Sequence, residues 1–387
     1  MTFPMSRVAS LVAGVVGLVV VNSLPVLLGV LKTNLGLGAG ALGSYGSAET
    51  IGLALGTLAA VFALRRTSPR LVAAGGLILA CAADLASFWL PSISELTAVR
   101  WIGGFGTGFT QGACFLVYGE SHREENQAIY SIGQTGLAFL VIWVTPAVVT
   151  SFGWRSIFVL LALLMVPALV LVRFFPAVKI KSTTVQGVRK AAPLSAPVWF
   201  ALAGVSMFYV GQGALWAFLE TIGDASGFSA ETVHTAMTVC AAFGTLGPIV
   251  VLFLADRIRP AIPLLSSVAI TLVAVPFMQS RSPLIYGASI SAFFFCLSVF
   301  AAYQFGVIAG AERSGRAAVL MSTANYGGFS VSAYLGGQMA EHFGYSSLQV
   351  FDMVMMTSAL LTLLWLIKST ANQAHAPDTP TSLSDAI

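Results

Sequence analysis

The tripeptide Phe152-Gly153-Trp154 returns as Phe343-Gly344-Tyr345, and the two copies lie 191 residues apart. The same spacing, without a gap, aligns identical residues along most of the chain. These pairs are Gly36 with Gly227, Gly56 with Gly247, Arg66 with Arg257, Pro69 with Pro260, Ser131 with Ser322, Gly136 with Gly327 and Ser156 with Ser347. A register shared over this length indicates that one unit was duplicated in the same orientation.

The composition places both copies in a membrane. Of 387 residues, 57% are hydrophobic and only 9% are charged, whereas soluble domains carry about 25% charged residues. A soluble body of this size exposes a large, charged surface to water, so contact with a lipid bilayer must replace the missing charges. The net charge of +4 is too small for a nucleic-acid-binding surface, which argues against a nucleic-acid partner.

Apolar segments of membrane-spanning length divide the chain evenly. A hydrocarbon core of roughly 30 Å needs about 20 mostly apolar residues per helix. The predicted spans are 6–31, 40–64, 71–90, 96–118, 127–149 and 154–174, then 197–222, 233–255, 262–279, 284–310, 317–340 and 347–367. The sequence thus predicts an all-α integral membrane protein with twelve transmembrane helices in two six-helix bundles, residues 1–174 and 197–368. A cytoplasmic linker at 175–196 joins them, and a disordered cytoplasmic tail follows at 369–387.

Loop charges predict the orientation of these spans. Of 19 Lys and Arg residues, fifteen fall in loops on the side that holds both termini, three fall on the other side and Arg100 lies inside a helix. Cytoplasmic loops carry an excess of Lys and Arg. We therefore expect both termini in the cytoplasm and a multi-pass protein of the cell membrane, which in a bacterium is the inner membrane.

Three motifs resemble those of the major facilitator superfamily. Residues 100–108, Arg-Trp-Ile-Gly-Gly-Phe-Gly-Thr-Gly, are similar to its Arg-x-x-x-Gly-x-Gly-x-Gly motif on the fourth helix. Residues 254–259 resemble its motif between helices eight and nine, and residues 153–155 its start of helix six. The resemblance covers residues 7–368 and implies a two-bundle transporter whose helices one, four, seven and ten line a central cavity. Two departures from the family are Arg65, at its usual Asp position, and residues 133–146, which lack the helix-five pattern of many drug antiporters.

Charged residues inside the predicted spans are candidates for function, because each costs at least about 2.5 kcal/mol at membrane depth. They are Glu49, Asp84, Arg100, Glu220, Asp352 and, at a span edge, Asp256. Scaffold features should recur at the repeat spacing. The positions matching the first five are Cys240, Val275, Ser291, Gly29 and Leu161, none of which is charged.

The roles expected for these charges differ. Glu49 and Glu220 are candidate proton carriers, since protonation neutralises a carboxyl in a medium of low dielectric; the alternatives are a structural hydrogen bond for Glu49 and a snorkelling side chain for Glu220. Arg100 would either attract an anionic substrate or bond helix-end carbonyls. The resemblance places Asp84 and Asp352 on helices that face lipid, which favours structural roles.

Polar and aromatic residues at helical spacing predict a substrate cavity. The candidate substrate-binding residues are Asn22, Arg100, Gln111, Tyr118, Gln134, Gln212, Trp216, Tyr303, Gln304 and Asn325. Gln134 and Asn325 match across the repeat, so we expect them to face each other between the bundles. Asp256 and Arg257 are expected to form a loop ion pair that gates the inner face. The spacings Gly52/Gly56 and Gly104/Gly108 predict close helix packing.

Other chemistries find little support in the sequence. The four cysteines lie in apolar runs without metal-ligand spacing, so we expect neither a metal nor a cofactor. Residues 38–43 fit GxGxxG, yet no strand precedes them, and no Walker sequence supplies ATP binding. His234 is read as an interfacial residue or, alternatively, a proton relay. A membrane enzyme would need a nucleophile with its base, which the spans lack.

These observations predict a monomeric secondary transporter that takes a small-molecule substrate and a proton. The leading hypothesis is proton-coupled symport of a small organic anion, motivated by Arg100 and by the missing antiporter pattern. The alternative within transport is proton-driven efflux of drugs or metabolites. A sensor that binds a ligand without moving it is a further class.

Overall fold

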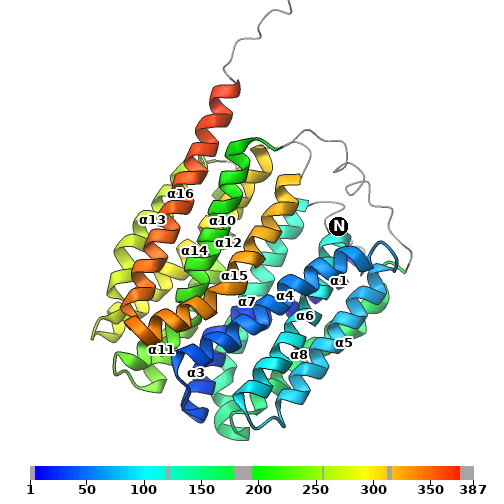
Figure 1. Cartoon of the computed structure of the whole chain (residues 1–387), viewed down its shortest axis with the longest axis vertical. Helices are drawn as coiled ribbons and strands as arrows, with labels where there is room; N and C mark the ends of the chain where they lie inside the picture. Colours follow the sequence, from blue (N-terminus) through cyan, green and yellow to red (C-terminus); the bar gives the residue numbers. More distant parts are fainter. Residues whose placement is uncertain (1–4, 119–122, 178–193, 255–256, 312–315, 375–387) are drawn as a thin grey trace, which may run out of the picture.

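Helices are the regular secondary structure of the residues that the structure describes, and short turns and loops join them (Figure 1). This computed structural model describes residues 5–118, 123–177, 194–254, 257–311 and 316–374. The first half contains α1 (Met5–Gly17), α2 (Val19–Asn22), α3 (Leu24–Leu35), α4 (Ala39–Ala63), α5 (Pro69–Ser87), α6 (Ile93–Tyr118), α7 (Arg123–Phe152), α8 (Ser156–Leu171) and η1 (Val172–Phe174). The second half contains α10 (Ala196–Ala217), α11 (Leu219–Ala225), α12 (Ala230–Leu254), α13 (Ala261–Ala274), η2 (Val275–Gln279), α14 (Pro283–Ala311), α15 (Arg316–Phe343) and α16 (Ser346–Ala374).

Two predicted spans are broken rather than continuous. The first predicted span consists of α1, α2 and α3, with breaks at Leu18 and Ser23. Pro25 in the first turn of α3 explains the second break, because proline disfavours helical geometry in the residue before it and lacks an N–H donor. The seventh predicted span is broken at Phe218, between α10 and α11, where no proline is present.

Helix length and surface composition suit a membrane. Among the described residues, nine helices are long and apolar enough to cross one. Large apolar side chains such as Trp143, Phe253 and Leu284 are exposed, as expected where lipid rather than water covers a protein. The protein is therefore a multi-pass membrane protein. The count of twelve spans stays a prediction, because it adds α6, α15 and the broken first span to these nine helices.

Helix ends in the two halves match at the predicted repeat spacing. The helices α4 and α12 each contain 25 residues, and their ends lie 191 positions apart. The glycines with positive φ in the described chain are Gly36, Gly153, Gly227 and Gly344, which form two pairs at that spacing. Each follows a helix end, where the left-handed conformation favours glycine. These coincidences support the duplication, which remains an inference.

The two bundles meet along a few helix pairs. The helix α4 packs against α15, α7 against α12, and α3 against α11; α4 and α15 cross near the lower centre of Figure 1. One apolar cluster continues from the first bundle, with Leu27 and Phe158, into the second, with Trp216 and Phe293. The core is thus shared between the bundles.

The predicted linker and tail are largely outside the described residues. Of the linker, positions 178–193 are not described, and the tail is not described from 375 onward. The helix α16 continues past Lys368 to Ala374, into the segment predicted to be disordered.

Candidate functional site: a buried charge cluster and the polar bundle interface

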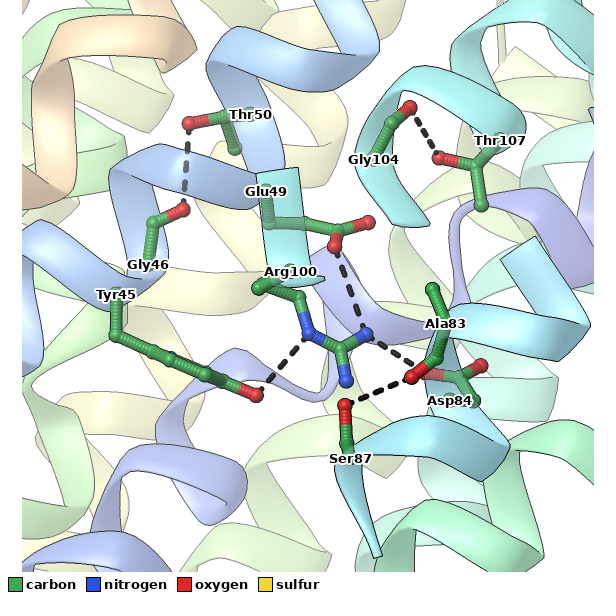
Figure 2. A network of polar contacts seen from close by, with 10 residues as sticks. All are labelled: Tyr45, Gly46, Glu49, Thr50, Ala83, Asp84, Ser87, Arg100, Gly104 and Thr107. Atoms are coloured by element: carbon green, nitrogen blue, oxygen red, sulfur yellow. Dashed lines mark hydrogen bonds and ion pairs between the residues drawn. The ribbon is translucent and has the colours of Figure 1, made fainter. Parts of the chain in front are cut away.

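Arg100 lies at the centre of a charge cluster buried inside the first bundle (Figure 2). Its Nη1 is 2.8 Å from Oδ1 of Asp84 and 3.6 Å from Oε2 of Glu49, and its Nε donates a 3.1 Å hydrogen bond to the Tyr45 hydroxyl. The helices α4, α5 and α6 supply these side chains. We call Tyr45, Glu49, Asp84 and Arg100 the charge cluster.

Glycines let the three helices approach closely enough to build the charge cluster. A Cβ on Gly104 of α6 would collide with the backbone carbonyl of Glu49, and a Cβ on Gly52 of α4 would collide with that of Trp101. On α5, Gly76 lies against the α6 backbone in the same way. The close packing predicted from the glycine spacing is confirmed, and it holds the Arg100 guanidinium between two carboxylates.

The charge cluster contains two carboxylates and one cation, and the two carboxylates contact the cation unequally. Arg100, Glu49 and Asp84 are each 1% exposed. Asp84 makes the closer contact with Arg100, whereas both carboxylate oxygens of Glu49 are buried without a hydrogen bond. Arg100 also lies over the rings of Tyr45 and Phe158, at 5.7 and 5.8 Å. If both acids are ionised, one cation faces two anions and the cluster carries one net negative charge.

Arg100 was expected either to attract an anionic substrate or to bond helix-end carbonyls, and its contacts in the structure are with acidic and aromatic side chains. The guanidinium is paired inside its own bundle, and it points toward α4 and α5. Asp84 was expected to have a structural role on a helix that faces lipid, and its buried ion pair with Arg100 agrees with such a role. A signal for this pair exists in the sequence, because Asp84 and Arg100 lie within about two turns of the short loop that joins α5 to α6. Residues so placed on neighbouring helices reach the same membrane depth.

Polar residues predicted for the cavity form contacts near the bundle interface. In the first bundle Asn22 donates a long 3.5 Å hydrogen bond from Nδ2 to Oε1 of Gln134. Gln111 donates from Nε2 to the carbonyl of Gly14 at 2.6 Å and accepts from the Tyr130 hydroxyl at 3.4 Å. The structure therefore brings Asn22 and Gln134 together, and it ties Gln111 to α1 and α7.

Trp216 links the two bundles. Its indole Nε1 donates a 3.2 Å hydrogen bond to the carbonyl of Val21, next to the break between α2 and α3. Its ring stacks on Phe294 at 4.2 Å between centroids. A broken helix frees carbonyls for such a bond, so the break in the first span has a direct role at the interface.

Other predicted residues of the second bundle are buried or partly buried. Gln212 is 1% exposed and donates from Nε2 to the Met356 sulfur at 3.4 Å. Tyr303 and Gln304 are buried on α14, at 7% and 0% exposure. On α15, the Oδ1 of Asn325 is buried without a hydrogen-bond partner. No contact places Asn325 against Gln134 among the hydrogen bonds between described residues.

For three predicted residues, the structure gives no contact that tests the predicted role. The side chain of Tyr118 and the whole of Asp256 lie outside the described residues. Arg257 is exposed in the turn that follows α12. The gating ion pair between Asp256 and Arg257 therefore stays a prediction.

Polar contacts close the bundle interface at the end away from the chain termini. Lys32 of α3 pairs with Asp224 of α11 at 3.5 Å. Glu220 lies against Gly29, where a Cβ would collide with its carboxylate. Glu341 of α15 accepts a 2.7 Å hydrogen bond from the Gly40 amide in the first turn of α4, a position where a helix end favours a negative charge. These contacts hold this end of the bundles together.

Comparisons with known proteins agree with this architecture. The family model described as Major Facilitator Superfamily matches residues 9–310. No curated protein matches the sequence significantly. A D-xylose–proton symporter has a similar structure, with a TM-score of 0.74, 14% identity and coverage of 94% of this chain and 97% of that one.

Two further solved structures share the fold. The nucleoside transporter NupG gives a TM-score of 0.71 at 12% identity, covering 94% of this chain and 99% of that one. The xylose transporter XylE from E. coli, in an inward-open conformation, gives 0.72 at 12% identity, covering 94% and 95%. At such identities the likeness shows the fold alone, while the family match indicates a transporter rather than an enzyme. The chain belongs to the major facilitator superfamily.

Proposed function

We propose that this protein is a proton-coupled secondary transporter in which the charge cluster binds the coupling proton. The observation that carries this proposal is the buried Glu49, whose carboxylate oxygens lack hydrogen bonds although Arg100 is 3.6 Å away. An ion buried at membrane depth is costly unless it is paired. One proton on Glu49 leaves one cation, one carboxylate and one neutral acid, so the cluster becomes neutral.

The cluster can link this proton to helix movement. Glu49 lies on α4, which packs against α15 of the other bundle. The hydroxyl of Ser47, two residues away, accepts a 2.7 Å hydrogen bond from the Tyr334 amide. Loss of the proton would restore a net negative charge beside this contact. We infer that the protonation state of Glu49 biases the packing of α4 on α15 and thereby the exchange between closed and open forms.

The direction and substrate extend the proposal. With both termini in the cytoplasm, the closed end carrying Lys32–Asp224 faces outward, and these contacts part when the transporter opens to the outside. We propose symport of a small organic anion, for which Arg100 is the candidate cation in the first bundle. Arg100 is already paired with Asp84. An anionic substrate can therefore bind Arg100 directly only after that ion pair loosens; otherwise its charge acts on the charge cluster as a whole.

The test uses purified protein in liposomes that enclose a pH-sensitive dye. A panel of small carboxylic acids and their neutral amide analogues is added outside at equal internal and external pH. Symport predicts that some of the acids acidify the lumen faster than they do in protein-free liposomes, whereas the amides cause no acidification. Alkalinisation of the lumen on adding organic cations would instead support the efflux antiporter.

Glu49→Gln is the decisive variant in this assay. Gln keeps the shape and cannot carry a proton, so we expect the dye response to vanish while exchange of labelled substrate across the membrane continues. Cys240→Ser, at the matching position of the second bundle, is the control and should keep the response. A full dye response in Glu49→Gln would remove Glu49 from the proposal.

A further inference from the structure

The second bundle contains a buried carboxyl that the proposed function does not use. Asp352 of α16 is 0% exposed, and neither of its carboxylate oxygens has a hydrogen-bond partner among the described residues. No ion pair of the described chain includes it. An unpaired carboxylate at membrane depth is so unfavourable that the neutral acid is the form this position accommodates.

Helix α10 packs directly against α16 at Asp352. The Asp352 backbone lies against Gly211, where a Cβ would come within 3.3 Å of the Asp352 Cα. The neighbouring residue Gln212 donates its amide to the sulfur of Met356, one turn beyond Asp352 on α16. The Oε1 of Gln212 is buried without a partner, so a hydrogen-bond acceptor is left open beside this helix contact.

A second amide lies one turn before Asp352 on the same helix. Gln349 is 7% exposed, and its Nε2 lacks a partner. Gln349, Asp352 and Met356 follow one another at helical spacing on α16, and the last two contact α10. We call Gln212, Gln349 and Asp352 the α10–α16 polar seam; every member has at least one buried polar atom without a hydrogen bond.

Charged groups elsewhere do not compensate Asp352. The elements packed against α16 are α10, α13, η2, α14 and α15. The titratable residues on them are Tyr209 on α10, Tyr286, Cys296 and Tyr303 on α14, and Arg316, Tyr326, Tyr334, Glu341 and His342 on α15; α16 itself adds Lys368. Glu341 and His342 are exposed at the end of α15, Arg316 begins that helix at its other end, and Lys368 lies sixteen residues along α16. A proton is therefore the cation that suits this seam.

We propose that Asp352 binds a proton and, as the neutral acid, donates a hydrogen bond to Oε1 of Gln212. The bond joins α16 to α10, the helix that carries Trp216 to the bundle interface. Removal of the proton would require water to enter the seam and would separate the two helices there. The inference goes beyond the proposed function, because it adds a proton site in the other bundle and can be measured without any substrate.

The test is infrared spectroscopy of the purified full-length protein at neutral pH, in the C=O stretching region of protonated carboxylic acids. We expect Asp352→Asn to remove one component that shifts on exchange into D2O. Glu49→Gln should remove a different component. If it removes none, the proton on Glu49 is contradicted, while the result for Asp352 is unaffected. An unchanged spectrum in Asp352→Asn would show that the carboxyl is ionised and would overturn the inference.

A second variant covers the case in which Asp352→Asn does not fold. Gln212→Leu removes the acceptor and keeps the carboxyl, so the Asp352 component should move to higher frequency, as expected for an acid that has lost its hydrogen bond. The matched control is Gln111→Leu, which removes a buried amide of the first bundle and should leave this component in place. No shift in Gln212→Leu would overturn the hydrogen bond to Gln212.

Discussion

At matching positions, the first bundle contains charged residues and the second bundle contains uncharged ones. At the predicted repeat spacing, the charge cluster residues Tyr45, Glu49, Asp84 and Arg100 correspond to Ala236, Cys240, Val275 and Ser291. These four are also buried, with exposures between 0% and 8%. The two bundles of this chain therefore fold around these positions with or without charge. The charges of the first bundle need a reason other than the scaffold.

The helix packing around those positions also differs between the two bundles. In the first bundle, Gly104 and Gly108 bring the α6 backbone against α4. Their counterparts in the second bundle are Phe295 and Val299, and there Gly244 of α12 faces the ring of Phe294 instead of a backbone. In the first bundle α4 and α6 thus meet backbone to backbone beside an ion pair. The matching contact of α12 with α14 uses apolar side chains together with one close backbone approach, where a Cβ on Gly247 would lie 3.1 Å from the Phe295 carbonyl oxygen.

The largest effect is expected from removing the cation of the charge cluster. Arg100→Leu leaves two buried acids without a partner, and breaking a buried pair costs about 3 to 5 kcal/mol. We expect a strongly lowered denaturation temperature and poor yield of folded protein. Ser291→Ala, at the matching position, should change stability by less than about 1 kcal/mol, because the Ser291 hydroxyl makes no hydrogen bond to lose.

An uncharged triple variant sharpens this comparison. Glu49→Met, Asp84→Leu and Arg100→Met together imitate the second bundle, and replacing a buried ion network by packed apolar residues is often neutral or stabilising. We expect stability near that of the natural protein, with loss of the proton-dependent dye response. A triple variant as unstable as Arg100→Leu would mean that ionic attraction itself builds the first bundle.

An intermediate effect is expected from filling the glycine contact. Gly104→Ala drives a methyl group into the Glu49 carbonyl, and such overpacking typically costs about 1 to 3 kcal/mol. Gly75→Ala is the control in α5, since a Cβ there meets nothing within 4 Å. Alanine in a helix interior should gain about 0.5 to 1 kcal/mol over glycine. Equal denaturation temperatures for the two variants would contradict the close backbone contact.

The smallest effect concerns the ion pair at the closed end. Lys32 and Asp224 are each 30% exposed in their side chains, and pairs of this kind contribute about 0 to 1 kcal/mol. Lys32→Gln should scarcely alter thermal stability, and it should raise hydrogen–deuterium exchange at the α3–α4 loop. A double-mutant cycle with Asp224→Asn measures the coupling energy between Lys32 and Asp224. A coupling energy as large as that between Arg100 and Asp84 would contradict the expected difference between exposed and buried ion pairs.

Much of the fold could be predicted from the sequence, because hydropathy and helix length are local properties. The membrane class and the close packing at Gly52 and Gly104 follow from composition and spacing, and the family follows from the resemblance of residues 100–108 to its fourth-helix motif. The breaks at Leu18 and Phe218 did not, since an apolar run gives no local sign of where its hydrogen bonding is interrupted. Pro25 was a partial sign for the first span, while the break at Phe218 has no such sign.

The candidate site was predictable only as a set of residues. The sequence selected Glu49 and Arg100 because charges are costly at membrane depth and do not recur in the repeat. It leaves two roles open for Arg100, substrate contact or a bond to helix-end carbonyls, and it favours structural roles for Asp84 and Asp352 without naming their partners. The direction of a side chain around its helix depends on which neighbours pack there, and this is a property of the whole bundle.

By itself, the sequence determined that this protein is helical, lies in a membrane and carries a few unrepeated charges, because hydrophobicity, span length and internal spacing can be read along the chain. Only the tertiary structure decided that Arg100 pairs with Asp84 and Glu49, that Trp216 reaches Val21 across the interface, and that Asp352 faces α10 without a partner. Helix rotation and helix pairing set those contacts, since they bring together residues from distant segments whose spacing in the chain carries no record of their distance in space.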